Sequence, residues 1–135
     1  MRAFAQRVAR RLPASYKPLF GSAEEVPQVL LDQGNFCSLL PVTAPAFLHQ
    51  LLKVCLDRQV AAILPLGIEE LYPIAEARSL FSEYGVEVWL PDAATLASIP
   101  IIENPPKQLR LKLTEEGVFT PSDSGNELAL CCVSE

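Results

Sequence analysis

The sequence predicts an α/β protein in which helices cover both faces of a parallel sheet, giving three layers. Apolar runs at residues 36–42, 60–66 and 86–90 alternate with helical patterns at 44–58 and from 69 onward. The run at 60–66 lacks polar alternation, which is typical of a strand buried on both faces. Strands that alternate with helices in this way indicate parallel pairing through crossover helices.

The first helix is expected at residues 2–12, because Phe4, Val8 and Leu12 fall on one helical face. The same segment is Arg-rich and free of acids, as transit peptides are, but it lacks their serines. An ordinary amphipathic helix is therefore favoured over a transit peptide. A short strand is expected at 17–20, and Thr43 is expected to cap the helix at 44–58.

Local signals bound the next two helices. Glu69 and Glu70 lie in the first turn of the helix after 60–66, where carboxylates complement the helix dipole. Gly85 is expected to end that helix in the left-handed conformation. Asp92 then predicts the N-cap of a short helix at 93–98.

The pattern changes after the two prolines at 105 and 106. Residues 107–113 alternate between apolar and polar positions, which predicts a half-exposed strand, followed by a turn at 115–117. Residues 127–133 form a second dense apolar run. We expect one domain over 1–135, with an α/β core at 1–104 and a β extension at 107–135.

Charge and composition exclude several classes of protein. Of 135 residues half are hydrophobic, and the net charge is −5. The first 23 residues carry five basic side chains and no acid, which leaves six basic and sixteen acidic side chains elsewhere. An acidic chain of this kind argues against nucleic-acid binding. The absence of an apolar run near the ~20 residues of a membrane span argues against a membrane protein.

The cysteines and the single histidine indicate neither a metal site nor a disulfide framework. The four cysteines form no C-x-x-C pair, and His49 alone leaves no zinc-finger spacing. Each cysteine lies in apolar sequence, as buried thiols do. We therefore expect a cytoplasmic protein with no metal ligands and no cofactor of its own.

Four residues are candidates for binding a small ligand: Ser22, Thr43, Gly67 and Glu70. The first three are expected near the carboxyl ends of strands, where open α/β sheets bind ligands, and Glu70 follows the corner that contains Gly67. Adjacent glutamates more often mark a solvated helix start than an acid–base pair. No catalytic residue is predicted.

A series of motifs between residues 22 and 96 resembles the N-terminal, pre-ATP-grasp domain of ATP-grasp ligases of the carbamoyl-phosphate-synthase type. These motifs are "PVTAP" at 41–45, "LPLGIEEL" at 64–71, "IAEAR" at 74–78 and "GVEVWLP" at 85–91. In that family a strand ending in proline opens a helix, and "PT.D" opens the next. Here Leu66 and Ile68 replace the Thr and Asp of that motif.

The resemblance implies a Rossmann-like fold and a non-catalytic accessory or oligomerisation domain. It implies a homodimer or docking on an ATP-grasp catalytic partner. ATP and magnesium are implied only if a catalytic region is joined to the chain, since no phosphate-binding glycine motif is present. Two alternatives stay open, namely a fragment of an ATP-dependent carboxylate–amine ligase and a small-ligand binding module.

The family's first strand and glycine turn have no counterpart before residue 2. Because that strand lies in the middle of the family's sheet, its loss would leave unpaired strand edges. We expect residues 127–133 to fill its place, since an unbroken apolar strand suits an interior position. The alternative is a hairpin of residues 127–133 with 109–113.

Overall fold

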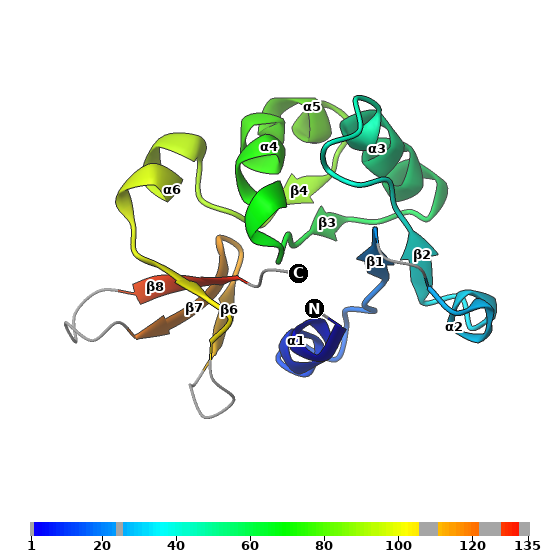
Figure 1. Cartoon of the computed structure of the whole chain (residues 1–135), viewed down its shortest axis with the longest axis horizontal. Helices are drawn as coiled ribbons and strands as arrows, with labels where there is room; N and C mark the ends of the chain where they lie inside the picture. The colour runs from blue at the N-terminus through cyan, green and yellow to red at the C-terminus, as the bar shows by residue number, and fades with distance from the viewer. Residues whose placement is uncertain (1, 24–25, 106–110, 122–127, 133–135) are drawn as a thin grey trace. The chain divides into compact units, whose positions relative to one another are not determined.

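The computed structural model describes residues 2–23, 26–105, 111–121 and 128–132 (Figure 1). The chain divides into two compact units, one of Leu12–Val60 and one of Met1–Arg11 with Ala61–Glu135. We call these the inserted unit and the discontinuous unit. This division does not coincide with the boundary expected at 104–107. The prediction of a single domain stays a prediction.

The inserted unit contains one pair of parallel strands. β1 (Phe20–Ser22) pairs with β2 (Phe36–Ser38), and the short helix α2 (Gln28–Asp32) connects them. The rings of Phe20 and Phe36 stack with centroids 5.1 Å apart across the pair. The unit therefore begins with a small βαβ arrangement, one strand of which was expected slightly earlier, at 17–20.

The main helix of this unit is α3 (Phe47–Asp57), whose buried side chains are Phe47, Leu51, Leu52 and Cys55. The spacing of Phe47, Leu51 and Cys55 places them on one helical face, whereas Leu56 is exposed. The expected cap at Thr43 is wrong, because the N-cap position is Ala46 and Thr43 lies in a turn. Successive backbone bonds from Ala44 N to Pro41 O and from Phe47 N to Ala44 O form turns before the helix starts.

The discontinuous unit contains a second parallel pair. β3 (Ala62–Ile63) pairs with β4 (Glu87–Val88), and the 3-10 turn η1 (Ile68–Glu70) and helices α4 (Leu71–Glu76) and α5 (Arg78–Glu83) lie between them in sequence. Figure 1 draws α4 and α5 on one side of this pair. Gly85 has φ 78°, so the expected left-handed end of the helical region is confirmed.

The helix α6 (Ala93–Ser98) follows β4 and has the bounds that the sequence predicted. Asp92 Oδ1 accepts a hydrogen bond of 2.8 Å from Thr95 N, which confirms the expected cap. α6 leads to β5 (Ile101–Glu103), a strand between prolines that the sequence reading did not predict.

The last strands build a four-stranded sheet in the order β5-β8-β7-β6. β6 (Lys112–Thr114) and β7 (Gly117–Pro121) form a hairpin at the expected turn, and β8 (Leu128–Cys132) lies antiparallel to β7 and parallel to β5. Gly117 has φ 124°, and an added Cβ would come within 2.9 Å of Leu130 Cδ1. Only glycine fits this position without strain.

Helix α1 (Arg2–Ala9) belongs to the discontinuous unit. Its Phe4 and Val8 are buried in a cluster with Leu111 and Val118, and partly buried leucines pack against that cluster: Leu64, Leu66 and Leu113. Since about 25 cal/mol accompanies each Å² of apolar surface removed from water, this contact stabilises the first helix through residues far along the chain.

The expected three-layer Rossmann-like sheet is corrected by the structure. The protein is mixed α/β, but the described residues contain two separate two-stranded parallel sheets and one four-stranded sheet rather than one extended sheet. Pro41 and Pro65 lie near the ends of two expected strands, and Pro91 directly follows the third. Because proline cannot donate a ladder hydrogen bond, the paired segments are only two or three residues long.

The expected place of residues 127–133 is also corrected. β8 does not join the β3–β4 pair but lies between β5 and β7. Its apolar sequence correctly predicted an interior position, but the position lies in the four-stranded sheet and not beside β3 and β4. The alternative hairpin with 109–113 is not formed by the described part of that segment, because β6 pairs with β7; residues 109–110, 127 and 133 lie outside the described residues.

Candidate functional site

The corner between β3 and α4 is closed by its own carboxylate. Glu70 Oε1 accepts hydrogen bonds of 3.0 Å from both Leu66 N and Gly67 N, and Glu70 N donates to Gly67 O at 3.0 Å. Glu70 is half-buried and Gly67 is buried. The backbone N–H groups of Leu66 and Gly67, which could otherwise bind a ligand or water, therefore bind the side chain of Glu70.

Gly67 is suited to this corner by space rather than by backbone angle. Its φ of −84° is open to any residue, but an added Cβ would lie 3.3 Å from Glu70 Cδ. The small residue lets the carboxylate approach the backbone closely. The structure thus brings together two of the four expected ligand-binding residues.

Ser22 and Thr43 belong to the inserted unit, whereas Gly67 and Glu70 belong to the discontinuous unit. Ser22 is the last residue of β1, half-buried, and its carbonyl accepts from Leu39 N at 2.8 Å. Thr43 is exposed in the turn before α3. The expectation that these four residues bind a ligand stays a prediction.

A cleft of about 430 Å³ lies elsewhere in the discontinuous unit. It is bounded by α5, the α5–β4 turn, β4 and the β6–β7 turn. Its charged and aromatic lining residues are Arg78, Glu87, Trp89 and Glu115. The volume lies within the usual range for small-ligand sites.

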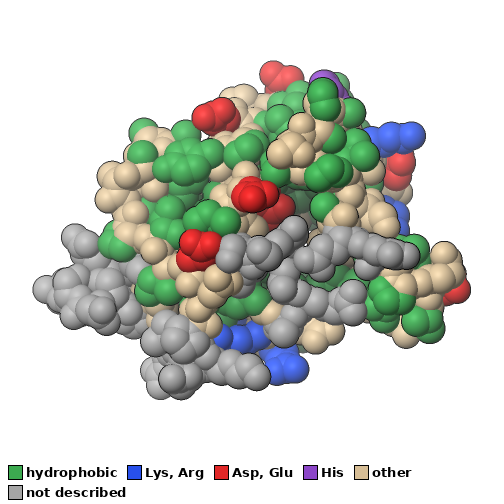
Figure 2. Space-filling model, viewed as in Figure 1, with side chains coloured by type: hydrophobic (Ala, Val, Ile, Leu, Met, Phe, Trp, Pro, Cys, Tyr) green, Lys and Arg blue, Asp and Glu red, His purple; other side chains and the backbone are tan. Residues whose placement is uncertain are grey.

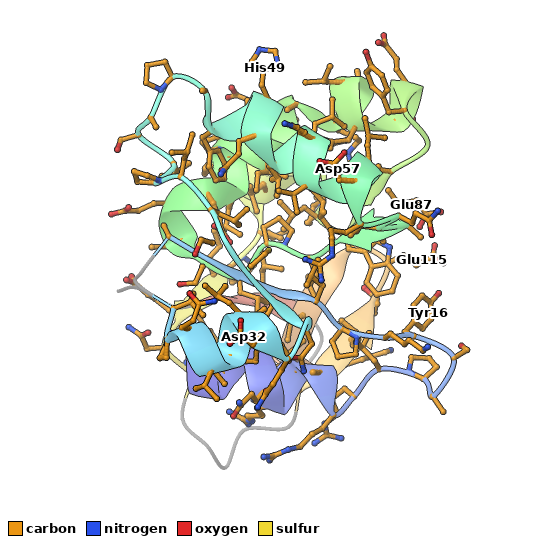
Figure 3. The ribbon with its side chains drawn as sticks, turned by 90° about the vertical axis from the view of Figure 1, so that its right-hand side faces the viewer. Tyr16, Asp32, His49, Asp57, Glu87 and Glu115 are labelled. Atoms are coloured by element: carbon orange, nitrogen blue, oxygen red, sulfur yellow. The ribbon has the colours of Figure 1, made fainter. Side chains whose placement is uncertain are left out.

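Two glutamates provide the exposed charge of this cleft. Glu87 and Glu115 are both exposed, and Figure 3 shows their side chains on the same side of the structure. The buried Trp89 donates its indole Nε1–H to Glu87 Oε2 at 3.1 Å, which orients that carboxylate. The cleft can therefore accept hydrogen bonds from a cationic group.

Arg78 also lines the cleft and adds a cationic side chain to it. Its Nη2 donates to Leu90 O, and its Nε is buried without a hydrogen-bond partner. The pKa of Asp92 is lowered, first by the hydrogen bonds from Thr95 and also by the charge of Arg78. Arg78 therefore links α5 to the segment after β4, and the cleft holds two carboxylates and one guanidinium.

The sequence reading did not select these cleft residues. A signal was present in the alternation of residues 86–90, which places Glu87 outward from a buried strand. Glu115 lies in the turn that the sequence predicted at 115–117. That Glu87 and Glu115 line one cleft could not be predicted, because it depends on how the β6–β7 hairpin packs beside β4.

The described cysteine thiols lie in apolar surroundings. Burial raises the pKa of Cys37, against the effect of the nearby Arg58 guanidinium, and burial together with Cys37 raises that of Cys55 to about 11. Both thiols are thus protonated at neutral pH, so they are weak nucleophiles.

Within the part of the chain that the structure describes, no group of three His, Cys, Asp or Glu side chains could hold a metal ion. No described helix is both long and apolar enough to cross a bilayer. A scan of protein-family models found no match, and neither did searches of the curated proteins and of the solved structures.

Proposed function

We propose that this chain is a non-catalytic accessory or oligomerisation domain related to the N-terminal domain of ATP-grasp ligases. The parallel β3–β4 pair supports the kinship, because the motif "LPLGIEEL" directly follows β3 and the motif "GVEVWLP" contains β4. The Rossmann-like origin of the fold and the membership in this family are part of the proposal.

The corner closed by Glu70 is the observation that carries the non-catalytic role. In open α/β proteins ligands bind beyond the carboxyl ends of strands, where backbone amides and polar side chains are available. Here Leu66 N and Gly67 N both bind Glu70 Oε1. Leu66 and Ile68 also place apolar side chains where the family has polar ones, which favours a self-contained corner.

We further propose that the protein is cytoplasmic and acts through contacts with other chains. Its partner is a second copy or an ATP-grasp catalytic region, and ATP and magnesium would belong to that region. An intact protein with such a region would be an ATP-dependent carboxylate–amine ligase. The chain by itself would bind neither cofactor.

Calorimetry and thermal unfolding test this function. We expect MgATP, MgADP, inorganic phosphate and free amino acids to leave the melting temperature unchanged. A ligand present at a hundred times its dissociation constant would stabilise the protein by about 2.7 kcal/mol, which is readily measured. A saturable shift with MgATP or MgADP would show a nucleotide site in this chain and overturn the accessory role.

A small-ligand binding module is the second candidate, and the cleft lined by Glu87 and Glu115 favours it. Amide hydrogen exchange during the same ligand screen separates the two functions. Protection confined to β4 and the β6–β7 turn would support the module. No ligand-dependent protection is expected for the accessory domain.

A further inference from the structure

Oppositely charged surfaces lie on the discontinuous unit. Arg10 and Arg11 directly follow α1 and are exposed, within a 23-residue segment that has five basic side chains and no acid. Figure 2 shows blue side chains gathered where Figure 1 draws α1. The apolar side of α1 is occupied by its contact with Leu111 and Val118, so these arginines are held at a surface.

The acidic counterpart is the cleft already described. Glu87 on β4 and Glu115 in the β6–β7 turn line the same concave surface, and Trp89 orients the carboxylate of Glu87. Arg78 lines this surface too, but its Nη2 donates to Leu90 O, so the two exposed carboxylates outnumber it. Its volume of about 430 Å³ leaves room for a long side chain. Arginine suits such a place because its planar guanidinium can bind carboxylates through two hydrogen bonds at once.

We propose that two copies of this chain form a dimer in which Arg10 and Arg11 of each copy bind the Glu87–Glu115 cleft of the other. The inference rests on the proposed oligomerisation function and supplies its contact surface. A second copy is the occupant that charge complementarity favours, since every copy carries both surfaces. Two equivalent contacts related by a two-fold axis close the assembly.

Sedimentation equilibrium and light scattering measure the association. In about 50 mM NaCl we expect a mass near twice that of the 14.8 kDa chain. In about 0.5 M NaCl screening should return the mass toward that of one chain. A single-chain mass at low salt, a dimer unaffected by salt, or assemblies that grow without limit would each overturn the proposal.

Charge reversal tests the two surfaces directly. Arg10→Glu with Arg11→Glu, and separately Glu87→Lys with Glu115→Lys, should each abolish the dimer, because like charges then meet. Mixing the two variants should restore it as a heterodimer, since both contacts again join opposite charges. Failure of the mixture to associate would overturn the pairing.

Matched controls separate this result from misfolding. Glu69→Lys with Glu76→Lys reverses two exposed glutamates outside the cleft and should leave the dimer intact. Loss of the dimer in this control would show a general charge effect and overturn the specific contact. Circular dichroism checks that each variant is folded.

Glu115→Lys alone provides a variant that spares the bond between Glu87 and Trp89, and it should weaken association at least tenfold. Unchanged association of a folded Glu115→Lys would contradict the contact. A monomer in all these measurements would leave the ligand screen unaffected, so failure of the dimer is distinguishable from failure of the accessory role.

Discussion

Two strand-to-helix corners in the discontinuous unit are closed by carboxylates that act in opposite directions. After β3, Glu70 reaches back from η1 to Leu66 N and Gly67 N. After β4, Asp92 reaches forward from the loop to Thr95 N. Both accept hydrogen bonds from backbone N–H groups at or next to a helix start. Comparing them separates the cap that the sequence analysis predicted from the cap that it did not predict.

The two caps differ in exposure and in the number of bonds. Glu70 is half-buried and its Oε1 accepts from two backbone N–H groups, whereas Asp92 is exposed and its Oδ1 accepts from one backbone N–H group. A charged acceptor shielded from water has fewer alternatives to its protein partners. We therefore expect the corner after β3 to be the more sensitive to substitution.

The largest effect is expected for Glu70→Ala, which removes the acceptor of two backbone donors in a half-buried corner. The free energy of unfolding should fall by about 2 kcal/mol. Urea denaturation of both proteins measures the difference. Glu69→Ala is the matched control, since Glu69 is exposed in the same turn and its loss should change stability by less than about 0.5 kcal/mol. Equal effects at both positions would contradict the comparison.

A smaller effect is expected for Gly67→Ala, and it should depend on Glu70. The new Cβ would meet Glu70 Cδ at 3.3 Å, while the backbone angles suit alanine. The substitution should destabilise the wild-type protein but be neutral or stabilising in Glu70→Ala, because alanine restricts the unfolded chain. A double-mutant cycle should give a coupling energy of roughly 0.5–1 kcal/mol, and strict additivity would show that the two residues do not constrain each other.

The smallest effect is expected at Asp92, through pH. Hydrogen bonds from Thr95 lower the pKa of Asp92, so its contribution is complete above the unfolded value of about 3.9. The contribution is lost as the pH falls through the lower pKa of the folded state. The stability difference between wild type and Asp92→Ala should therefore shrink on acidification. Asp92→Asn keeps a capping oxygen and should remove this pH dependence. A stability difference between wild type and Asp92→Ala that grows on acidification would contradict the prediction.

The sequence predicted best those features whose causes are local. Asp92 and the residues after it set the bounds of α6 without help from the rest of the chain. The turn predicted at 115–117 likewise depends on neighbouring residues, and it joins β6 to β7. The same reasoning failed at Thr43, where consecutive turns delay the helix to Phe47.

The remaining features depend on contacts that no local pattern encodes. β5 lies between prolines and is a strand because β8 pairs with it, and β8 in turn occupies a sheet that motif order did not indicate. The role of Glu70 was closer to being readable. Its position three residues after Gly67 has the spacing of a capping box, with glycine in place of serine or threonine. Because the corner resembles a ligand-binding one, Gly67 and Glu70 were predicted to bind a ligand rather than each other.

The contact of α1 with the β6–β7 hairpin has a consequence for how the protein is made. Phe4 and Val8 leave the ribosome long before Leu111 and Val118, the residues that cover them. At translation rates of about 5–20 residues per second, the helix must wait with its apolar side uncovered for several seconds. During that interval the nascent chain presents a short amphipathic segment to chaperones.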